Sequence, residues 1–299
     1  MTPIGGSEIL YNNLIKYTGQ DWQKSINLIM SFCDPARINT SKLNILWQHL
    51  MTDQGAVTGM QHSEFVDMPD HYVYVSNWQL NQFKDTFNIN HVSNHVIKNA
   101  IEPIEYREKP TGKIRLIYTS MPDRGLEVLL DAFQIMNRDD VELVVYSSNI
   151  IYGKGYSDSR AGIYDHLFHR CKTTPGIIYK GYAMNKAVRM ALQSSHILAY
   201  PSIYEETSCL AAIEAGAAGC KIVTTDLGAL PETCDKWATY VPHVFDRREL
   251  AENYAKILNN EIDNYASTCY NSKEQSDWFN NEYSWVNRSK EWIDFFNKI

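Results

Sequence analysis

From residue 113 onwards, short apolar runs alternate with longer segments in which apolar side chains recur every three or four positions. The apolar runs are typical of buried strands, and the longer segments are typical of helices that cover a sheet. The predicted strands are Ile114–Thr119, Val141–Ser147, Gly176–Tyr182, His196–Tyr200 and Lys221–Thr225, and the predicted helices are Arg124–Met136, Ala161–Cys171, Asn185–Ser195 and Ser208–Ala218. This alternation predicts an α/β fold with a parallel, doubly wound sheet.

The first hundred residues show the same pattern on a smaller scale. They predict helices at Gly5–Tyr17 and Trp78–Phe87, and strands at Ser25–Phe32, Leu43–Trp47, His71–Ser76 and His95–Ile97. Residues 103–112, with two prolines and mixed charge, separate the two patterns. We therefore expect a compact first domain over residues 1–102, a hinge over 103–112 and a second domain over 113–280.

The loops that follow the predicted strands of the second domain gather at one edge of its sheet. They comprise residues 120–124, 147–155, 181–183 and 202–206. Because ligands of doubly wound sheets bind outside the carboxyl ends of the strands, we expect the ligand site at this edge.

A glutamate stands directly before one predicted helix, and a second glutamate follows eight positions later inside it. If the helix begins near Thr207 or Ser208, its first amides lack carbonyl partners and favour an anion such as phosphate. Glu206 can then accept hydrogen bonds from hydroxyls attached to that phosphate, and Glu214 from more distant hydroxyls such as those of a ribose. The pattern therefore indicates a nucleotide-sugar site.

The two glutamates also have a purely structural interpretation, as a charge at a helix start and an exposed helix residue. Small and apolar residues surround Glu214, from Leu210–Ile213 to Ala215–Gly219. An unpaired carboxylate is costly in such a stretch, which favours the binding interpretation.

Arg124 follows a predicted strand and a proline-containing turn. Its guanidinium offers a fork of donors that suits phosphate oxygens, whereas an arginine without such a partner is unfavourable in the first turn of a helix. We expect Arg124 to neutralise the charge of a departing nucleoside diphosphate.

Composition narrows the functional classes. The chain has 299 residues, 44% of them hydrophobic, and a formal net charge of −7 that neither half reverses. Nucleic acid is therefore not an expected partner, and membrane contact is expected to be peripheral at most. The N-terminus has no basic and apolar leader and no run of eighteen apolar residues occurs, so we expect a cytoplasmic, soluble protein.

Cysteine and histidine spacing argues against a metal centre. The six cysteines form no C-x-x-C pair, and the histidines form no H-E-x-x-H motif. We expect reduced, buried thiols, no bound metal and no cofactor other than the sugar donor as co-substrate.

Several ordered segments resemble retaining GT-B glycosyltransferases of the family-4 type (glycosyl transferases group 1). They are the E-x7-E segment with its preceding Pro201-Ser202, the strand, turn and helix from Ile117 to Phe133, the loop Asp226–Glu232, and Tyr283-Ser284-Trp285. The resemblance implies two Rossmann-like domains facing a cleft, with a C-terminal helix over residues 281–299 that crosses back to the first domain.

The resemblance also implies site residues. Glu206, His49 and Arg124 would be catalytic, and His49 would lie near the donor sugar. The donor phosphates would meet Gly5, Gly6, Arg124, Thr207, Ser208 and Cys209, and the nucleotide would meet Glu214, Gly181, Tyr182 and Leu210.

The chain lacks one basic residue that the family pattern has. The family has a second basic residue five or six positions before Arg124, where this chain has Tyr118, Thr119 and Ser120. Candidates for the unassigned phosphate contact are Lys154, Arg160 and Lys180.

The resulting hypothesis is an enzyme, a glycosyltransferase of the hexosyltransferase type. It would move a sugar from a nucleoside-diphosphate sugar to a hydroxyl acceptor, which could be a glycan, a lipid-linked molecule or a small molecule. A nucleotide-sugar 2-epimerase of GT-B fold and a non-catalytic nucleotide-sugar-binding module remain alternatives.

Overall fold

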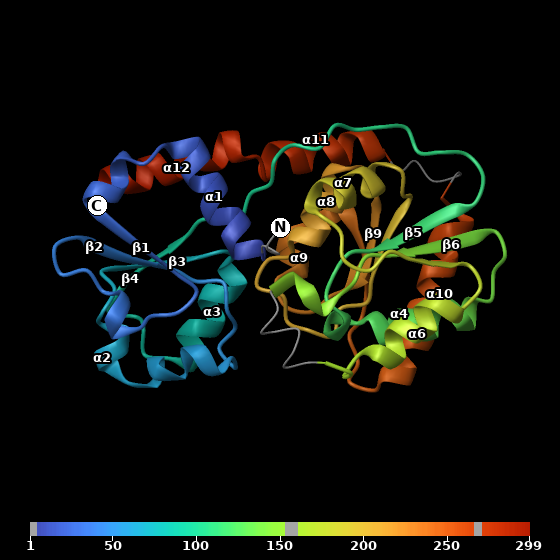
Figure 1. Ribbon diagram of the computed structural model, residues 1–299, viewed down its shortest axis with the longest axis horizontal. Coiled ribbons are helices and arrows are strands. Elements are labelled where there is room, and N and C mark those ends of the chain that lie inside the picture. The colour runs from blue at the N-terminus through green and yellow to red at the C-terminus, as the bar shows by residue number, and fades with distance from the viewer. Residues whose placement is uncertain (1–4, 153–160, 266–270) are drawn as a thin grey trace.

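A computed structural model describes residues 5–152, 161–265 and 271–299 of the chain. Two parallel sheets lie side by side, each covered by helices, and the C-terminal helices run along one side of both (Figure 1). The predicted α/β architecture with two Rossmann-like domains is confirmed.

The smaller sheet has the strand order β1-β2-β3-β4. Its strands are β1 (Ile26–Met30), β2 (Leu43–Trp47), β3 (His71–Tyr74) and β4 (Ser93–Val96), and its helices are α1 (Gly6–Thr18), α2 (Ser63–Val66) and α3 (Asn77–Thr86). The apolar side chains of α1 join one core with Trp47 and Val73, and Phe83 of α3 joins another with Tyr72 and Tyr74. Alternation along β3 thus buries both faces of the sheet.

The larger sheet has the order β10-β9-β8-β5-β6-β7. Its strands are β5 (Ile114–Tyr118), β6 (Val141–Val145), β7 (Ile177–Tyr179), β8 (Ile197–Tyr200), β9 (Lys221–Thr225) and β10 (Ala238–Val241). Its helices are α4 (Leu126–Met136), α6 (Asp165–Thr173), α7 (Asn185–Gln193), α8 (Leu210–Ala217), α9 (Leu230–Cys234), α10 (Arg247–Asp263) and α11 (Ser272–Glu282). The chain proceeds outward from β5 to β7 and then returns to place β8 on the other side of β5. The carboxyl ends of β5 and β8 therefore form the topological switch point at which such sheets bind ligands.

Three helices of the larger domain begin later than the sequence predicted: α6 begins at Asp165 instead of Ala161, and α4 and α8 begin later beside the site. Helix α4 begins at Leu126 because Gly125 adopts a positive φ of 117°, so Arg124 lies in a short 3₁₀ turn before it. Helix α8 begins at Leu210 because Cys209 has a φ of 154°, so Thr207 and Ser208 belong to a loop. The prediction that α8 begins at Thr207 or Ser208 is therefore wrong, because the chain forms a short loop before the helix begins at Leu210.

The C-terminal helices connect the two domains. Helix α11 packs on α8 of the larger domain, and α12 (Trp285–Lys298) packs on α1 of the smaller one. Where they meet, Ile101 donates to the Tyr283 carbonyl at 2.7 Å and accepts from the Trp285 amide at 3.2 Å. The buried rings of Trp285 and Trp292 complete the core beside α1. In the described ranges, no helix is both long and apolar enough to cross a membrane.

Candidate active site at the switch point

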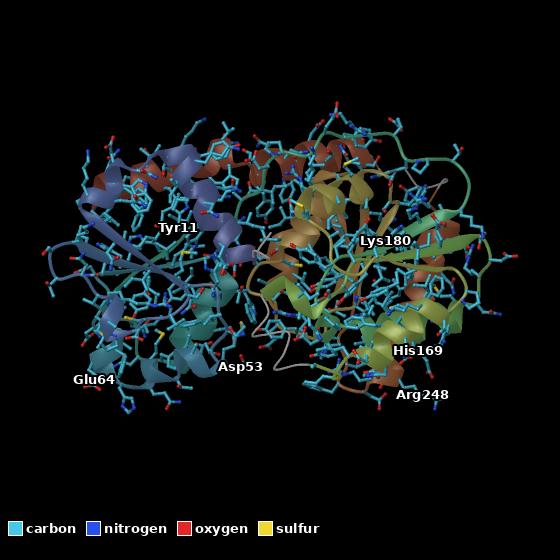
Figure 2. The ribbon with its side chains drawn as sticks, viewed as in Figure 1. Tyr11, Asp53, Glu64, His169, Lys180 and Arg248 are labelled. Carbon is cyan, nitrogen blue, oxygen red and sulfur yellow. The ribbon has the colours of Figure 1, made fainter. Side chains whose placement is uncertain are left out.

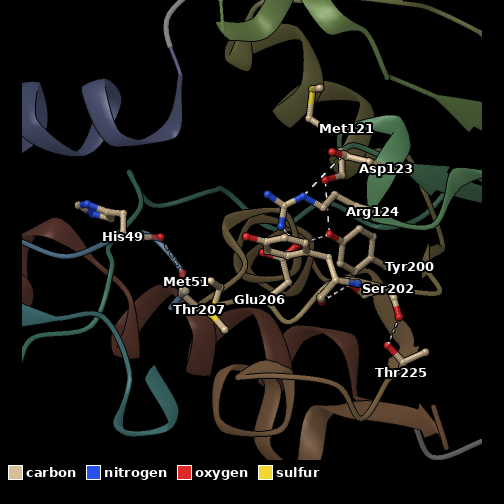
Figure 3. Close-up of polar contacts among 12 residues, drawn as sticks. His49, Met51, Met121, Asp123, Arg124, Tyr200, Ser202, Glu206, Thr207 and Thr225 are labelled. Atoms are coloured by element: carbon tan, nitrogen blue, oxygen red, sulfur yellow. Dashed lines mark hydrogen bonds and ion pairs between the residues drawn. The ribbon is translucent and has the colours of Figure 1, made fainter. Parts of the chain in front are cut away.

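An arginine and a glutamate meet at the switch point. Arg124, after β5, donates from Nη1 to Glu206 Oε1 at 3.2 Å, and its guanidinium carbon lies 3.4 Å from the centroid of the Tyr204 ring (Figure 3). The Tyr200 hydroxyl, at the end of β8, donates to the same oxygen at 2.5 Å. The Arg124 and Glu206 side chains are 19% and 15% exposed, so a charged cluster lies partly open at this edge.

Two glycines allow the loop that carries Glu206 to pack closely. A Cβ on Gly125 would lie 2.0 Å from the Pro201 carbonyl oxygen, and one on Gly228 would lie 2.6 Å from the Glu206 amide nitrogen. The Glu206 carbonyl also accepts from the Ala229 amide at 2.7 Å. Glu206 is therefore placed by backbone contacts on both sides, although it belongs to no helix.

His49 lies across from this cluster, after β2 of the smaller domain (Figure 3). Its carbonyl accepts from Thr207 Oγ1 at 3.2 Å. Both imidazole nitrogens are buried and reach no hydrogen-bond partner among the described residues. Burial lowers the pKa of His49 to about 4, although the nearby backbone of Trp47 opposes this shift, so the ring is neutral at pH 7.

The two domains touch directly beside the cluster. Ser76, the N-cap of α3, accepts from the Gln79 amide at 3.0 Å and donates to the Thr207 carbonyl at 2.7 Å. Glu232 of α9 accepts from the amides of Asn77 and Trp78, each at 2.9 Å. The start of α3 is thus held against the loop that precedes α8.

The start of α8 faces the glycine pair of the smaller domain. A Cβ on Gly6 would lie 3.3 Å from Leu210 Cδ1. Within the described part of the chain, the amides of Thr207, Ser208 and Cys209 donate to no protein acceptor. These three amides precede α8 rather than lying in its first turn, and they remain available to an anion.

The predicted nucleotide residues lie farther along the same edge. Glu214 is half-buried in α8, where Oε1 accepts from Asn185 Nδ2 at 2.9 Å and burial raises the pKa of the carboxyl above its ordinary value. Gly181, with a φ of 63°, and the exposed Tyr182 lie in the loop between β7 and α7. The roles of these residues stay predictions.

The second phosphate-binding cation is not identified. Lys180, which is labelled in Figure 2, is exposed after β7, while Lys154 and Arg160 lie outside the described residues. Among the residues that the structure describes, no group of three or more His, Cys, Asp or Glu side chains could hold a metal ion.

Sequence reasoning missed several neighbours of the site, including Tyr200, Tyr204 and Glu232, and also strand β10. Tyr200 ends an apolar run and was interpreted as core, although a tyrosine at the carboxyl end of a strand can present its hydroxyl to a ligand edge. The contact of Glu232 crosses between domains, and no local pattern carries that information.

The fold is that of a two-domain α/β protein, and the candidate site lies where the two domains meet. The model of the family described as glycosyl transferases group 1 matches residues 113–260. That segment belongs to this family, and the chain is a glycosyltransferase of GT-B fold. A search of curated proteins found no match.

Solved structures of the same fold include three glycosyltransferase-type proteins. Sucrose-phosphate synthase from Thermosynechococcus elongatus is 14% identical with a TM-score of 0.71, and the match covers 91% of this chain and 73% of that one. HepE from Anabaena, solved with UDP-glucose, is 14% identical with a TM-score of 0.68 and coverages of 86% and 73%. The trehalose-phosphate synthase from Burkholderia vietnamiensis is 11% identical with a TM-score of 0.67 and coverages of 97% and 77%.

Proposed function

We propose that this glycosyltransferase uses a nucleoside-diphosphate sugar as donor and transfers the sugar to a hydroxyl acceptor with retention of anomeric configuration. One observation carries the proposal. Arg124 and Glu206 are in contact at the switch point, between the amides before α8 and the imidazole of His49, which find no partner among the residues that the structure describes. A diphosphate suits Arg124 and the amides before α8, and an attached sugar suits Glu206 and His49.

In the proposed reaction, Arg124 and the amides of Thr207 and Ser208 stabilise the charge that develops on the departing diphosphate. The phosphate oxygen that leaves the sugar takes the proton of the acceptor hydroxyl. Attack on the face from which the diphosphate departs then gives retention. Glu206 orients the sugar hydroxyls and supports the positive charge that develops on the ring.

His49 contributes as a neutral group. With its pKa lowered to about 4 by burial, the imidazole has one donor and one acceptor nitrogen at pH 7. It can therefore bind a sugar hydroxyl without adding charge to the acceptor side. We propose that no metal ion takes part, because Arg124 and the amides supply the positive potential.

Related structures support a nucleotide-sugar donor. HepE was solved with UDP-glucose, and a pneumococcal O-GlcNAc transferase, GtfA, was solved with UDP and GlcNAc. A glycan or lipid-linked acceptor fits the same reaction, since the first domain would supply its binding surface.

The first test is a thermal-shift panel with UDP-, GDP-, ADP- and dTDP-glucose and the four free diphosphates. A donor at a hundredfold excess over its Kd stabilises the folded state by about 2.7 kcal/mol. Release of nucleoside diphosphate is then followed with sugar and lipid-linked acceptors, with and without EDTA.

Each outcome of this test separates one hypothesis. Diphosphate release that requires an acceptor supports transfer, and NMR of the product gives its anomeric configuration. Conversion of the donor without acceptor indicates epimerisation, and binding without turnover indicates a binding module. Turnover that is unchanged in Glu206→Gln would contradict the assignment of the site.

A further inference from the structure

Glu206 depends on a buried tyrosine of the neighbouring strand. Tyr200 is fully buried at the end of β8, where its carbonyl accepts from Thr224 Oγ1 at 2.8 Å. Its hydroxyl lies 2.5 Å from Glu206 Oε1 (Figure 3). The same hydroxyl lies 3.4 Å from Ser120 Oγ. The tyrosine is therefore anchored by the sheet while its hydroxyl reaches the site.

We propose that Tyr200 is a positioning residue that fixes the Glu206 carboxylate for the donor sugar. This inference rests on the proposed function, in which Glu206 contacts the sugar. Tyr200 holds Oε1 toward the larger domain, which directs Oε2 toward the bound sugar.

Two donors share Oε1 of Glu206. Arg124 and Tyr200 both donate to this oxygen, whereas Oε2 accepts no hydrogen bond from the described residues. In the proposed reaction Arg124 also binds the diphosphate, so its fork must be shared between Glu206 and the phosphate oxygens. Tyr200 has no such second task. It therefore keeps Glu206 in place when Arg124 turns to the donor.

The hydrogen bond from Tyr200 is needed because of the loop that carries Glu206. Glu206 lies in an irregular segment between β8 and α8, where no helix fixes its side chain. A carboxylate held only by Arg124 could rotate to form a paired, two-point contact with the guanidinium. That arrangement would withdraw both groups from the ligand at once.

The hydroxyl is a permanent donor. Burial, with the negative charge of Glu206 adding to it, raises the pKa of Tyr200 well above its ordinary value. The phenol thus stays protonated over the working pH range, and the contact does not switch with pH.

The test compares Tyr200→Phe with Tyr254→Phe. Tyr254 is equally buried and donates to the Val223 carbonyl at 2.7 Å, so its variant loses a buried tyrosine hydrogen bond without touching Glu206. Calorimetry measures the Kd of the panel's best nucleotide sugar and of its free diphosphate for each variant. Tyr200→Phe and Tyr254→Phe each keep the buried ring and remove only a hydroxyl, so thermal unfolding of the two variants checks that both fold.

Tyr200→Phe is expected to lower the preference for nucleotide sugar over free diphosphate about tenfold, and kcat to fall tenfold to a hundredfold, as for a hydrogen bond to a charged group. Tyr254→Phe should change neither. In a Glu206→Ala background, Tyr200→Phe should have no further effect on the sugar preference.

The outcomes keep this inference separate from the proposed function. If the wild-type protein binds no nucleotide sugar, the proposed function fails. If it binds one, but Tyr200→Phe and Tyr254→Phe show the same sugar preference, or if the effect of Tyr200→Phe persists without Glu206, the positioning role is overturned.

Discussion

At the residue scale, Arg124 and His49 show how the candidate site is prepared for a ligand. Arg124 is stacked on Tyr204 and bonded to Glu206, so its guanidinium is preorganised before any phosphate arrives. The buried nitrogens of His49 have no partner in the described part of the chain, an arrangement that costs stability and is retained where a ligand satisfies it. The His49 ring therefore favours binding over stability of the free protein.

Arg124→Lys tests the geometry of the cation. Lysine keeps the charge but loses the planar fork and the stacking on Tyr204, so we expect kcat/KM to fall about tenfold to a hundredfold and inhibition by free diphosphate to weaken. Release of diphosphate from the identified donor measures both kcat/KM and the inhibition by free diphosphate. Arg138→Lys, at a distant ion pair with Asp140 and Asp263, is the control and should be unaffected. Equal activity of Arg124→Lys and Arg138→Lys would show that Arg124 does not belong to the site.

His49 predicts how stability depends on pH. Its folded-state pKa of about 4 lies below the unfolded value of 6.5, so the unfolded chain binds more protons between these values. Stability therefore falls as pH drops from about 6.5 to about 4, by up to about 3 kcal/mol from this group. Urea unfolding at pH 7 and pH 5 measures the loss, and His49→Gln should lose less. An equal loss in His49→Gln would show that the ring is not buried in its neutral form.

At the scale of elements, the sheet order of the larger domain brings residues 82 positions apart into contact. The sequence pattern was sufficient for the strands β5 to β9, because each buried run has a clear apolar signal. It was insufficient for the starts of α4 and α8, because these depend on the backbone of Gly125 and Cys209. The placement of Glu232 could not be predicted either, since it results from packing between domains.

Gly125→Ala tests the close approach of two loops. An added Cβ would lie 2.0 Å from the Pro201 carbonyl oxygen and would also be strained at a φ of 117°. Gly112 has a similar φ of 110° with nothing within 4 Å, so Gly112→Ala carries the backbone strain alone. We expect Gly112→Ala to cost about 1 kcal/mol and Gly125→Ala at least about 2 kcal/mol more, with loss of turnover as the Glu206 loop moves. Denaturant unfolding compares them, and equal costs would mean that the loops separate freely.

At the scale of the whole molecule, the domains are joined by covalent crossings and by contacts at the site. The crossings are the segment that follows β4 and the passage from α11 to α12, which are hydrogen-bonded to each other at Ile101. The contacts are Ser76 with Thr207 and Glu232 with the start of α3. Because the second set lies beside the candidate site, we expect closure of the domains and assembly of the site to occur together.

Glu232→Ala tests whether this second set holds the domains closed. The carboxylate accepts from two amides at the positive end of α3, a contact that is worth about 1 to 2 kcal/mol and exists only when the domains touch. Its loss should increase the radius of gyration in solution scattering without donor and lower kcat/KM about tenfold.

Asp246→Ala is the matched control, because Asp246 caps α10 by accepting from the Glu249 amide at 2.8 Å within one domain. It should lose similar stability without opening. If both variants scatter alike and turn over alike, closure does not depend on Glu232, and the hinge geometry alone must set the distance between the domains.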